Sequence, residues 1–168
     1  AYVKQNLHSV AIDFYKKAVE LDSTNCTLHE TLASCYMKIR QYTEAATEYR
    51  RVIACDTSNL EMFKKLGNLL YQAKQYANSL PFLVHLVTRD TTAMKEKYQV
   101  VNAMYWTNRF TELIPFAESV LRNDSTKIDV LKILTIGYVK SKDYANAETA
   151  YLQLELKDTL KAEDYLEL

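Results

Sequence analysis

Aspartate recurs along this chain at one fixed step of 34 residues. The repeated positions are Asp22, Asp56, Asp90, Asp124 and Asp158, and each is followed directly by Ser or Thr. A step that stays constant over a chain of 168 residues indicates that one structural unit repeats without insertions. A unit of this size cannot bury its apolar face alone, so the units are expected to stack on one another.

Each period is predicted to contain two helices. Within residues 26–59, two apolar stripes with helical spacing are separated by a short polar turn at 40–42. The first stripe consists of Leu32, Cys35, Tyr36 and Ile39, and the second of Ala45, Tyr49, Val52 and Ile53. Only two Gly and two Pro occur in the whole chain, which leaves few tight turns for a β or Rossmann-type fold. The expected fold class is therefore all-α.

Three details of the repeat lead to local predictions. Ser58 and Glu61 have capping-box spacing, so Ser58 is expected to cap the next helix. Pro81 and Pro115 lie one period apart, inside or just past the first turn of a second helix, and are expected to delay or kink it. Gly67 occupies a column of small residues where two helices should approach closely.

The pattern resembles the tetratricopeptide repeat over the whole chain. The residues that carry the resemblance are Leu32-Ala33 and Leu66-Gly67, the aromatic Tyr36, and Tyr-x-x-Ala at 42–45 and 144–147. The resemblance implies a right-handed superhelical solenoid of antiparallel helix hairpins, with about 4.5 to 5 repeats. Two departures stand out: Ser or Thr replaces the family's usual Pro after the aspartate, and the Gly of the inner turn is absent.

The repeat register predicts a single solenoid domain over residues 1–168. Its parts are a part repeat at 1–25, repeats at 26–59, 60–93, 94–127 and 128–161, and the start of a further repeat at 162–168. Both ends fall within a repeat, so the chain is expected to be a fragment of a longer protein. No signal peptide is visible, and a cytoplasmic and a periplasmic location both stay open.

The sequence argues against catalysis by this segment. His8, His29 and His85 share no predicted helix face, and the two glycines cannot form a phosphate-binding loop. We therefore expect no catalytic residue, no metal and no cofactor. Lys plus Arg equal Asp plus Glu at 21 each, so no global field favours a nucleic-acid partner. No apolar run reaches the roughly 18 residues of a membrane span, so membrane insertion is not expected.

The three cysteines form no CxxC motif and have no metal-ligand spacing. Buried or half-buried helix positions are the favoured interpretation of Cys26, Cys35 and Cys55. A disulfide between Cys26 and Cys55 is conceivable, because they lie at opposite ends of one predicted hairpin. The sequence leaves that alternative open.

The resemblance implies that the first helix of each hairpin lines a concave wall, and that a peptide or protein binds there. The residues predicted to bind it are Lys64, Asn68, Tyr71, Lys95, Tyr98, Asn102, Tyr105, Trp106 and Lys132. Asparagine amides can donate to and accept from an extended backbone, aromatic rings supply flat contact area, and lysines can meet carboxylates. These aromatic side chains could also pad the interior of the solenoid.

Some tetratricopeptide-repeat domains clamp the carboxylate of chaperone tails with Lys, Asn and Arg over three repeats. Lys64 and Asn68 match the first pair of that set, whereas Gln99, Asp129 and Ile133 occupy the remaining positions. A chaperone clamp is therefore not expected. The alternative to a peptide-binding module is a structural, self-assembling spacer, associating through apolar residues of the terminal half-repeats. Those residues are Val3, Leu7, Tyr165 and Leu168.

Overall fold

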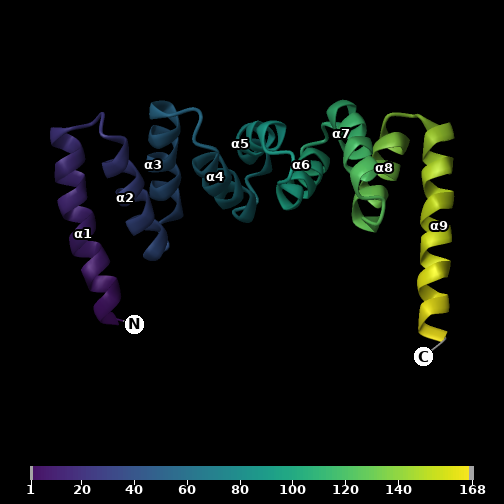
Figure 1. Ribbon diagram of the computed structural model, residues 1–168, viewed down its shortest axis with the longest axis horizontal. Helices are drawn as coiled ribbons and strands as arrows, with labels where there is room; N and C mark the ends of the chain where they lie inside the picture. Colours follow the sequence, from purple (N-terminus) through teal and green to yellow (C-terminus); the bar gives the residue numbers. More distant parts are fainter. Residues whose placement is uncertain (1, 167–168) are drawn as a thin grey trace. The chain divides into compact units, whose positions relative to one another are not determined.

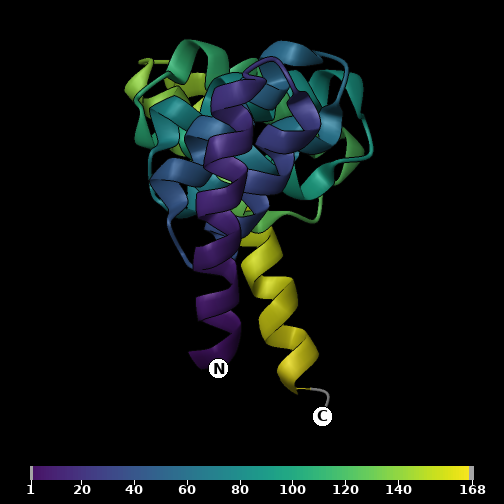
Figure 2. The same cartoon turned by 90° about the vertical axis from the view of Figure 1, so that its left-hand side faces the viewer.

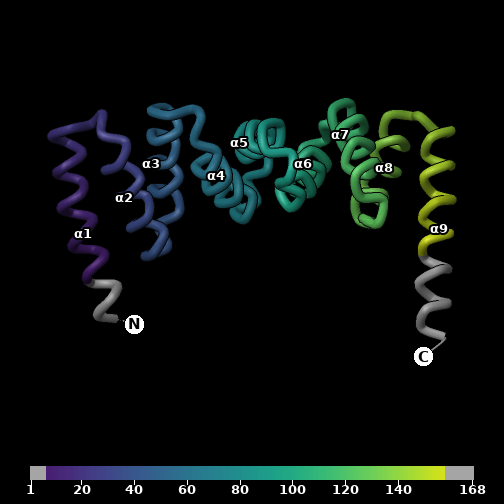
Figure 3. The backbone as a smooth tube through the Cα atoms, in the orientation of Figure 1, coloured from purple at the N-terminus to yellow at the C-terminus, as the bar shows by residue number. Residues whose placement is uncertain are grey.

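The computed structural model describes the backbone of residues 2–166 and the side chains of residues 7–157 (Figure 3). Over this range the chain forms nine α-helices, which Figure 1 labels. They are α1 (Tyr2–Leu21), α2 (Cys26–Lys38), α3 (Tyr42–Cys55), α4 (Leu60–Gln72), α5 (Tyr76–Arg89), α6 (Met94–Trp106), α7 (Phe110–Asn123), α8 (Ile128–Lys140) and α9 (Tyr144–Leu166). The predicted all-α fold is confirmed.

Helix starts follow the sequence period. The helices α2, α4, α6 and α8 begin 34 residues apart, and so do α3, α5, α7 and α9. The chain divides into two compact units, Ala1–Arg89 (unit 1) and Asp90–Leu168 (unit 2). We describe each unit by itself.

In unit 1 each helix packs against the next, from α1 through α5. Figure 2 views this unit from the side of α1, which lies nearest the viewer. The core consists of the apolar stripes on both helices of each hairpin, and Leu32, Leu66 and Leu83 are almost completely buried. The predicted close approach at Gly67 is present, because a Cβ there would lie 2.7 Å from Cδ2 of Leu83 on α5.

Unit 2 is built in the same way from α6 to α9, and α6 also packs directly against α8. Val100, Leu113 and Val120 are fully buried between these helices. Two first helices therefore lie next to each other in this unit. They present their outward positions as one surface.

The inner turn of every complete hairpin has the same backbone geometry. The middle residue of its three has positive φ, at 64° in Arg40, 57° in Lys74, 56° in Asn108 and 61° in Lys142. The following residue returns a hydrogen bond to the last turn of the first helix, as when the Gln41 N–H donates to the Tyr36 carbonyl at 2.9 Å. This is the Schellman type of helix end, which usually carries glycine at the positive-φ position. The chain builds it with Arg, Lys and Asn instead.

The repeated aspartates organise the turns between hairpins. The Asp56 carboxylate accepts from the backbone N–H of Ser58 at 2.9 Å and from its hydroxyl at 2.6 Å. Asp22, Asp90 and Asp124 make the same pair of bonds to the threonine two residues on. These bonds lower the pKa of Asp56 below its usual value, chiefly through the Ser58 hydroxyl. The 34-residue aspartate column therefore marks a recurring Asx-type turn.

The predicted cap at Ser58 is wrong, because Asp56 engages the Ser58 hydroxyl. The residue that caps α4 is Asn59, whose side chain accepts from the Met62 N–H at 3.3 Å. Asn25 caps α2 in the same way. The cap thus lies one residue later than the capping-box spacing suggested.

The prolines do not delay their helices. Pro81 lies inside α5, which begins at Tyr76, in the same register as α3 at Tyr42. Pro115 lies inside α7, which begins at Phe110. The sixth residue of each helix therefore lacks a backbone donor, while the helix start stays in register.

A disulfide joins Cys26 and Cys55, whose Cα atoms are 6.1 Å apart. Cys26 is the first residue of α2 and Cys55 the last of α3, so the bond ties the two ends of one hairpin together. Cys35 is a free, buried thiol. The structure has the bridge, the less favoured of the two interpretations, and Cys55 is exposed rather than buried or half-buried as expected.

Candidate functional site

A groove runs between the first helices α2 and α4 of unit 1 (the unit-1 groove). It encloses a cavity of about 470 Å³, and both Lys64 and Asn68 line it. The other lining residues are Ser34, Met37, Lys38, Tyr49, Glu61, Lys65, Leu69 and Gln72. Several lining residues come from one face of α4, because side chains three and four positions apart on a helix point in the same direction. The structure therefore brings Lys64 and Asn68 together in one concave site.

The base of the groove includes a side chain that the sequence analysis missed. Tyr49 belongs to a second helix, α3, yet it lines the cavity while only 4% of its surface is exposed. Burial raises the pKa of Tyr49, against a hydrogen bond with Ser34 that lowers it. Tyr49 belongs to the predicted packing stripe of the second helix, and periodicity alone does not distinguish a buried residue from one that closes a groove.

The unit-1 groove is rich in positive charge. Its lining holds the ammonium groups of Lys38, Lys64 and Lys65 against one carboxylate, that of Glu61. Lys65 also reaches Glu30 on α2, with 3.4 Å between Nζ and Oε1. Lysines on adjacent first helices therefore face the same cavity, which favours an anionic segment over a basic one.

Tyr71, predicted to bind, lies outside this lining. Its ring packs edge-on against Tyr76 at the start of α5, with 5.3 Å between ring centroids. Burial raises the pKa of the Tyr71 hydroxyl. This side chain packs within its own hairpin and is only partly exposed.

In unit 2, the first helices α6 and α8 present an aromatic and aliphatic surface (the unit-2 wall). Trp106 is 59% exposed and meets Tyr105 edge-on, with 5.4 Å between ring centroids. Ile136 and Val139 on α8 are 36% and 48% exposed, although they are large apolar residues. Asn102 on α6 is half-buried. Large aromatic residues at such positions supply much of the energy in protein interfaces.

Tyr98 is directed elsewhere within unit 2. Its hydroxyl donates to Oδ2 of Asp124 at 2.9 Å, and the Lys127 ammonium lies 5.2 Å from its ring centroid. Burial, followed by the hydrogen bond to Asp124, raises the pKa of Tyr98 to about 12. Tyr98 therefore ties α6 to the turn before α8. Lys95 on α6 and Lys132 on α8 are both exposed.

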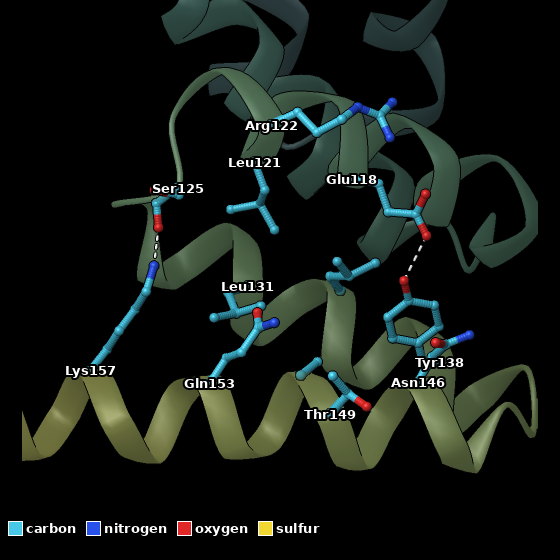
Figure 4. Close-up of a pocket in the computed structure, with 12 residues that line it drawn as sticks. Glu118, Leu121, Arg122, Ser125, Leu131, Tyr138, Asn146, Thr149, Gln153 and Lys157 are labelled. Atoms are coloured by element: carbon cyan, nitrogen blue, oxygen red, sulfur yellow. Dashed lines mark hydrogen bonds between the residues drawn. The ribbon is translucent and has the colours of Figure 1, made fainter.

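Unit 2 contains a cavity of about 360 Å³, which is formed by α7, α8 and α9 (Figure 4). The Tyr138 hydroxyl donates to Oε1 of Glu118 across it at 2.6 Å, and Lys157 donates to the Ser125 carbonyl. Burial and then this hydrogen bond raise the pKa of Tyr138 to about 12. None of the residues predicted to bind a peptide lines this cavity.

Two further properties concern the residues that the structure describes. Among them, no group of three or more His, Cys, Asp or Glu side chains could hold a metal ion. None of the described helices combines the length and the apolar character that crossing a bilayer requires.

Comparisons with known proteins agree with this architecture. The tetratricopeptide repeat family model matches residues 1–25. No curated protein sequence matches the chain. MamA of strain AMB-1 has a solved structure that is 17% identical to this chain, with a TM-score of 0.71 over 93% of this chain and 85% of its own.

Two other solved structures share the fold. YrrB, described as a TPR protein with an unusual peptide-binding site, is 22% identical, with a TM-score of 0.66 over 90% of this chain and 76% of its own. MamA from Desulfovibrio magneticus RS-1 is 15% identical, with a TM-score of 0.60 over 94% of this chain and 89% of its own. The repeat match at 1–25 and the shared fold confirm the resemblance to the tetratricopeptide repeat seen in the sequence.

Proposed function

We propose that this chain is a non-catalytic interaction module that binds a peptide or protein segment along its first helices. The observation that carries the proposal is the unit-1 groove, where Lys64 and Asn68 line a cavity with two more lysines. The three lysines still outnumber Glu61 and the Glu30 carboxylate that pairs with Lys65, and this net positive charge suits an acidic segment. The Asn68 amide is a side chain that can both donate to and accept from a peptide backbone.

The unit-2 wall supplies a second contact of a different kind. Trp106, Ile136 and Val139 offer exposed apolar area, and the half-buried Asn102 on α6 lies one period before Ile136. Apolar side chains of a partner would pack on the unit-2 wall, and carboxylates of a partner would meet the lysines of the unit-1 groove. The peptide-binding site stated for YrrB, which shares this fold, adds support for a peptide as the ligand class.

Selection from a displayed random peptide library tests this proposal. One enriched peptide is labelled with fluorescein, and its affinity is measured by fluorescence anisotropy. We expect acidic residues among the enriched sequences, and we expect affinity to fall at least tenfold in two double variants, Lys64→Ala/Asn68→Ala and Asn102→Ala/Trp106→Ala. Higher salt should weaken binding, because it screens the lysines.

Arg50→Ala is the matched control for these variants, since it removes an exposed positive charge from α3, a second helix. Its affinity should equal that of the parent chain. Unchanged binding in both double variants, with helicity and melting intact, would exclude the proposed surfaces. Enrichment of basic peptides would contradict the charge argument.

Self-association through the ends of the stack is a second candidate function. Leu7, Val10, Phe14 and Leu21 lie on one face of α1 and are 64%, 54%, 69% and 90% exposed. Tyr144, Tyr151, Leu152 and Leu156 are similarly exposed on α9. The predicted contacts Val3, Tyr165 and Leu168 lie outside the residues whose side chains the structure describes.

Light scattering over a range of concentrations separates the two candidates. Self-association predicts a mass that rises with concentration and a return to monomer in Leu7→Lys/Phe14→Lys. A binding module without self-association stays at 19.5 kDa throughout. A concentration-dependent mass that persists in the double variant would rule out the α1 stripe as the contact.

A further inference from the structure

The Cys26–Cys55 disulfide lies where an external thiol can reach it. Cys55 is exposed and Cys26 is half-buried. Both line an open cavity of about 560 Å³, together with Ser23, Thr24 and Arg51. Cys35, the remaining thiol, is buried and takes no part. The site therefore has one exposed and one half-buried cysteine residue, with room for a small thiol beside them.

The two sulfurs also differ in electrostatic environment. Cys26 is the first residue of α2, so it lies among the N–H groups that give a helix N-terminus its partial positive charge. Cys55 is the last residue of α3, at the partial negative end, and Asp56 follows it. A thiolate is consequently more stable on Cys26 than on Cys55. In thiol–disulfide exchange the more stable thiolate is the better leaving group.

A buried network keeps the hairpin together independently of the disulfide. His29 is 1% exposed, and its Nδ1 lies 2.6 Å from Oε2 of Glu48 on α3. Its Nε2 donates to the Ser23 carbonyl at 3.0 Å, because a carbonyl can only accept. Glu48 also accepts from Arg51 at 3.0 Å. These contacts join α2, α3 and the loop before α2, so loss of the disulfide would loosen the hairpin without removing its core.

We propose that Cys26–Cys55 is a thiol–disulfide exchange site, opened by low-molecular-weight thiols and dithiols, and that its opening loosens α2. The reductant thiolate attacks Sγ of Cys55, forms a mixed disulfide there and expels Cys26 as a thiolate. The second thiol of the reductant then attacks its own sulfur in the mixed disulfide and expels Cys55. Two electrons and two protons pass to the protein, which gains two thiols, and the dithiol becomes a cyclic disulfide.

The consequence concerns the unit-1 groove, and this part rests on the proposed function. Ser34, Met37 and Lys38 of α2 form one side of that groove. The disulfide restrains the start of the same helix. A thiol reductant would therefore make the groove less preorganised. The ligand would then bind with lower affinity, because part of the binding free energy is spent on ordering the surface.

Trapping the mixed disulfide tests the exchange step. The oxidised chain is mixed with glutathione, quenched with acid, alkylated and analysed by peptide mass mapping. We expect glutathione on Cys55 and the alkyl group on Cys26, with the reverse product at least tenfold rarer. Full reduction with dithiothreitol should expose Cys26 and Cys55 to alkylation and leave Cys35 unmodified. Equal or greater glutathione on Cys26 would overturn the assignment.

Hydrogen exchange without any ligand tests the loosening. Reduction should speed amide exchange in α2 by roughly tenfold or more and leave α6 to α9 unchanged. Cys26→Ser/Cys55→Ser should exchange like the reduced chain with or without reductant, and Cys35→Ser should respond like the parent. Equal exchange of α2 in both redox states would end the regulatory claim and leave peptide binding untouched. Failure to select a peptide would affect the proposed function alone.

Discussion

One residue in each inner turn adopts a strained backbone conformation, and these residues recur every 34 residues. Arg40, Lys74, Asn108 and Lys142 all have positive φ. In this region a side chain with a Cβ crowds the backbone, and asparagine tolerates it better than lysine or arginine. All four turns therefore place a larger residue where glycine would be preferred. At one of them, the chain has Asn108, and asparagine is the best tolerated residue after glycine.

Replacement of these residues by glycine should stabilise the fold. We expect Lys74→Gly to raise the free energy of unfolding by about 0.5 to 1 kcal/mol, because the relief of strain exceeds the extra entropy of glycine in the unfolded chain. Asn108→Gly is the matched comparison and should gain less. Urea unfolding followed by circular dichroism measures both. A larger gain at Asn108 than at Lys74 would show that backbone strain does not govern these turns.

The two glycines of the chain allow a similar comparison inside the helices. A Cβ at Gly67 would lie 2.7 Å from Leu83 Cδ2, whereas one at Gly137 would lie 3.1 Å from Leu113 Cδ2. We expect Gly67→Ala to cost about 1 to 2 kcal/mol, since the fully buried Leu83 has little room to move. Gly137→Ala should be nearly neutral, because better helix propensity offsets the tighter contact. Equal melting temperatures of the two variants would contradict this difference.

At the scale of elements, side chains at the turns link each helix to the next hairpin. Tyr98 on α6 donates to Asp124, the same aspartate that orders the turn before α8. The repeat thus uses one carboxylate for two tasks in this hairpin. Asp124 has a pKa below its usual value, first through the Thr126 hydroxyl and then through Tyr98.

The raised pKa of Tyr98 predicts a specific dependence of stability on alkaline pH. Folding raises this pKa from 10 to about 12, so the folded chain holds the phenol proton more tightly than the unfolded chain. The resulting stability is complete below pH 10 and is lost as pH rises from about 10 to about 12. Tyr98→Phe should therefore melt at a lower temperature than the parent below pH 10, with a difference that shrinks above it.

Thermal melts from pH 8 to pH 12 measure this effect, and Tyr144→Phe is the control because Tyr144 is 66% exposed. The control should follow the parent at every pH. A difference between Tyr98→Phe and the parent that stays constant up to pH 12 would show that folding does not raise the pKa of Tyr98.

The sequence predicted the elements better than their contacts, for physical reasons. The spacing of apolar residues and the positions of turn residues determine where helices start, so the hairpins could be predicted from the sequence pattern alone. Capping depends on which of several nearby side chains accepts a hydrogen bond from a free N–H. The Ser58 hydroxyl, which was expected to cap α4, donates to Asp56 instead. The disulfide followed from spacing only as a possibility, because proximity of Cys26 and Cys55 depends on how the hairpin closes.

The candidate site was predicted in the same uneven way. Lys64 and Asn68 line the unit-1 groove because a first-helix face follows from the period. Tyr49 was missed because it reaches the cavity from the second helix, at a depth that only packing determines. Tyr98 lies on a first helix at a position predicted to face the partner. Its hydroxyl instead donates to Asp124, which is 26 residues later in the sequence, and the repeat pattern does not predict that contact.

At the scale of the whole molecule, the chain consists of repeated hairpins whose first helices differ in chemistry between the two units. Three of the ten residues that line the unit-1 groove are lysines, whereas Trp106, Ile136 and Val139 are exposed on the unit-2 wall. A regular scaffold with irregular surface residues is how repeat proteins of one fold bind different partners. The central claim is therefore that the ligand contacts the first helices.

Nuclear magnetic resonance tests this claim most directly. A peptide enriched from the displayed library is titrated into the ¹⁵N-labelled chain, and backbone and indole shifts are followed. We predict shifts at Lys64, Asn68, Asn102 and the Trp106 indole, with α5, α7 and α9 largely unchanged. Shifts confined to those second helices, with the Trp106 indole and the unit-1 groove unaffected, would contradict the account.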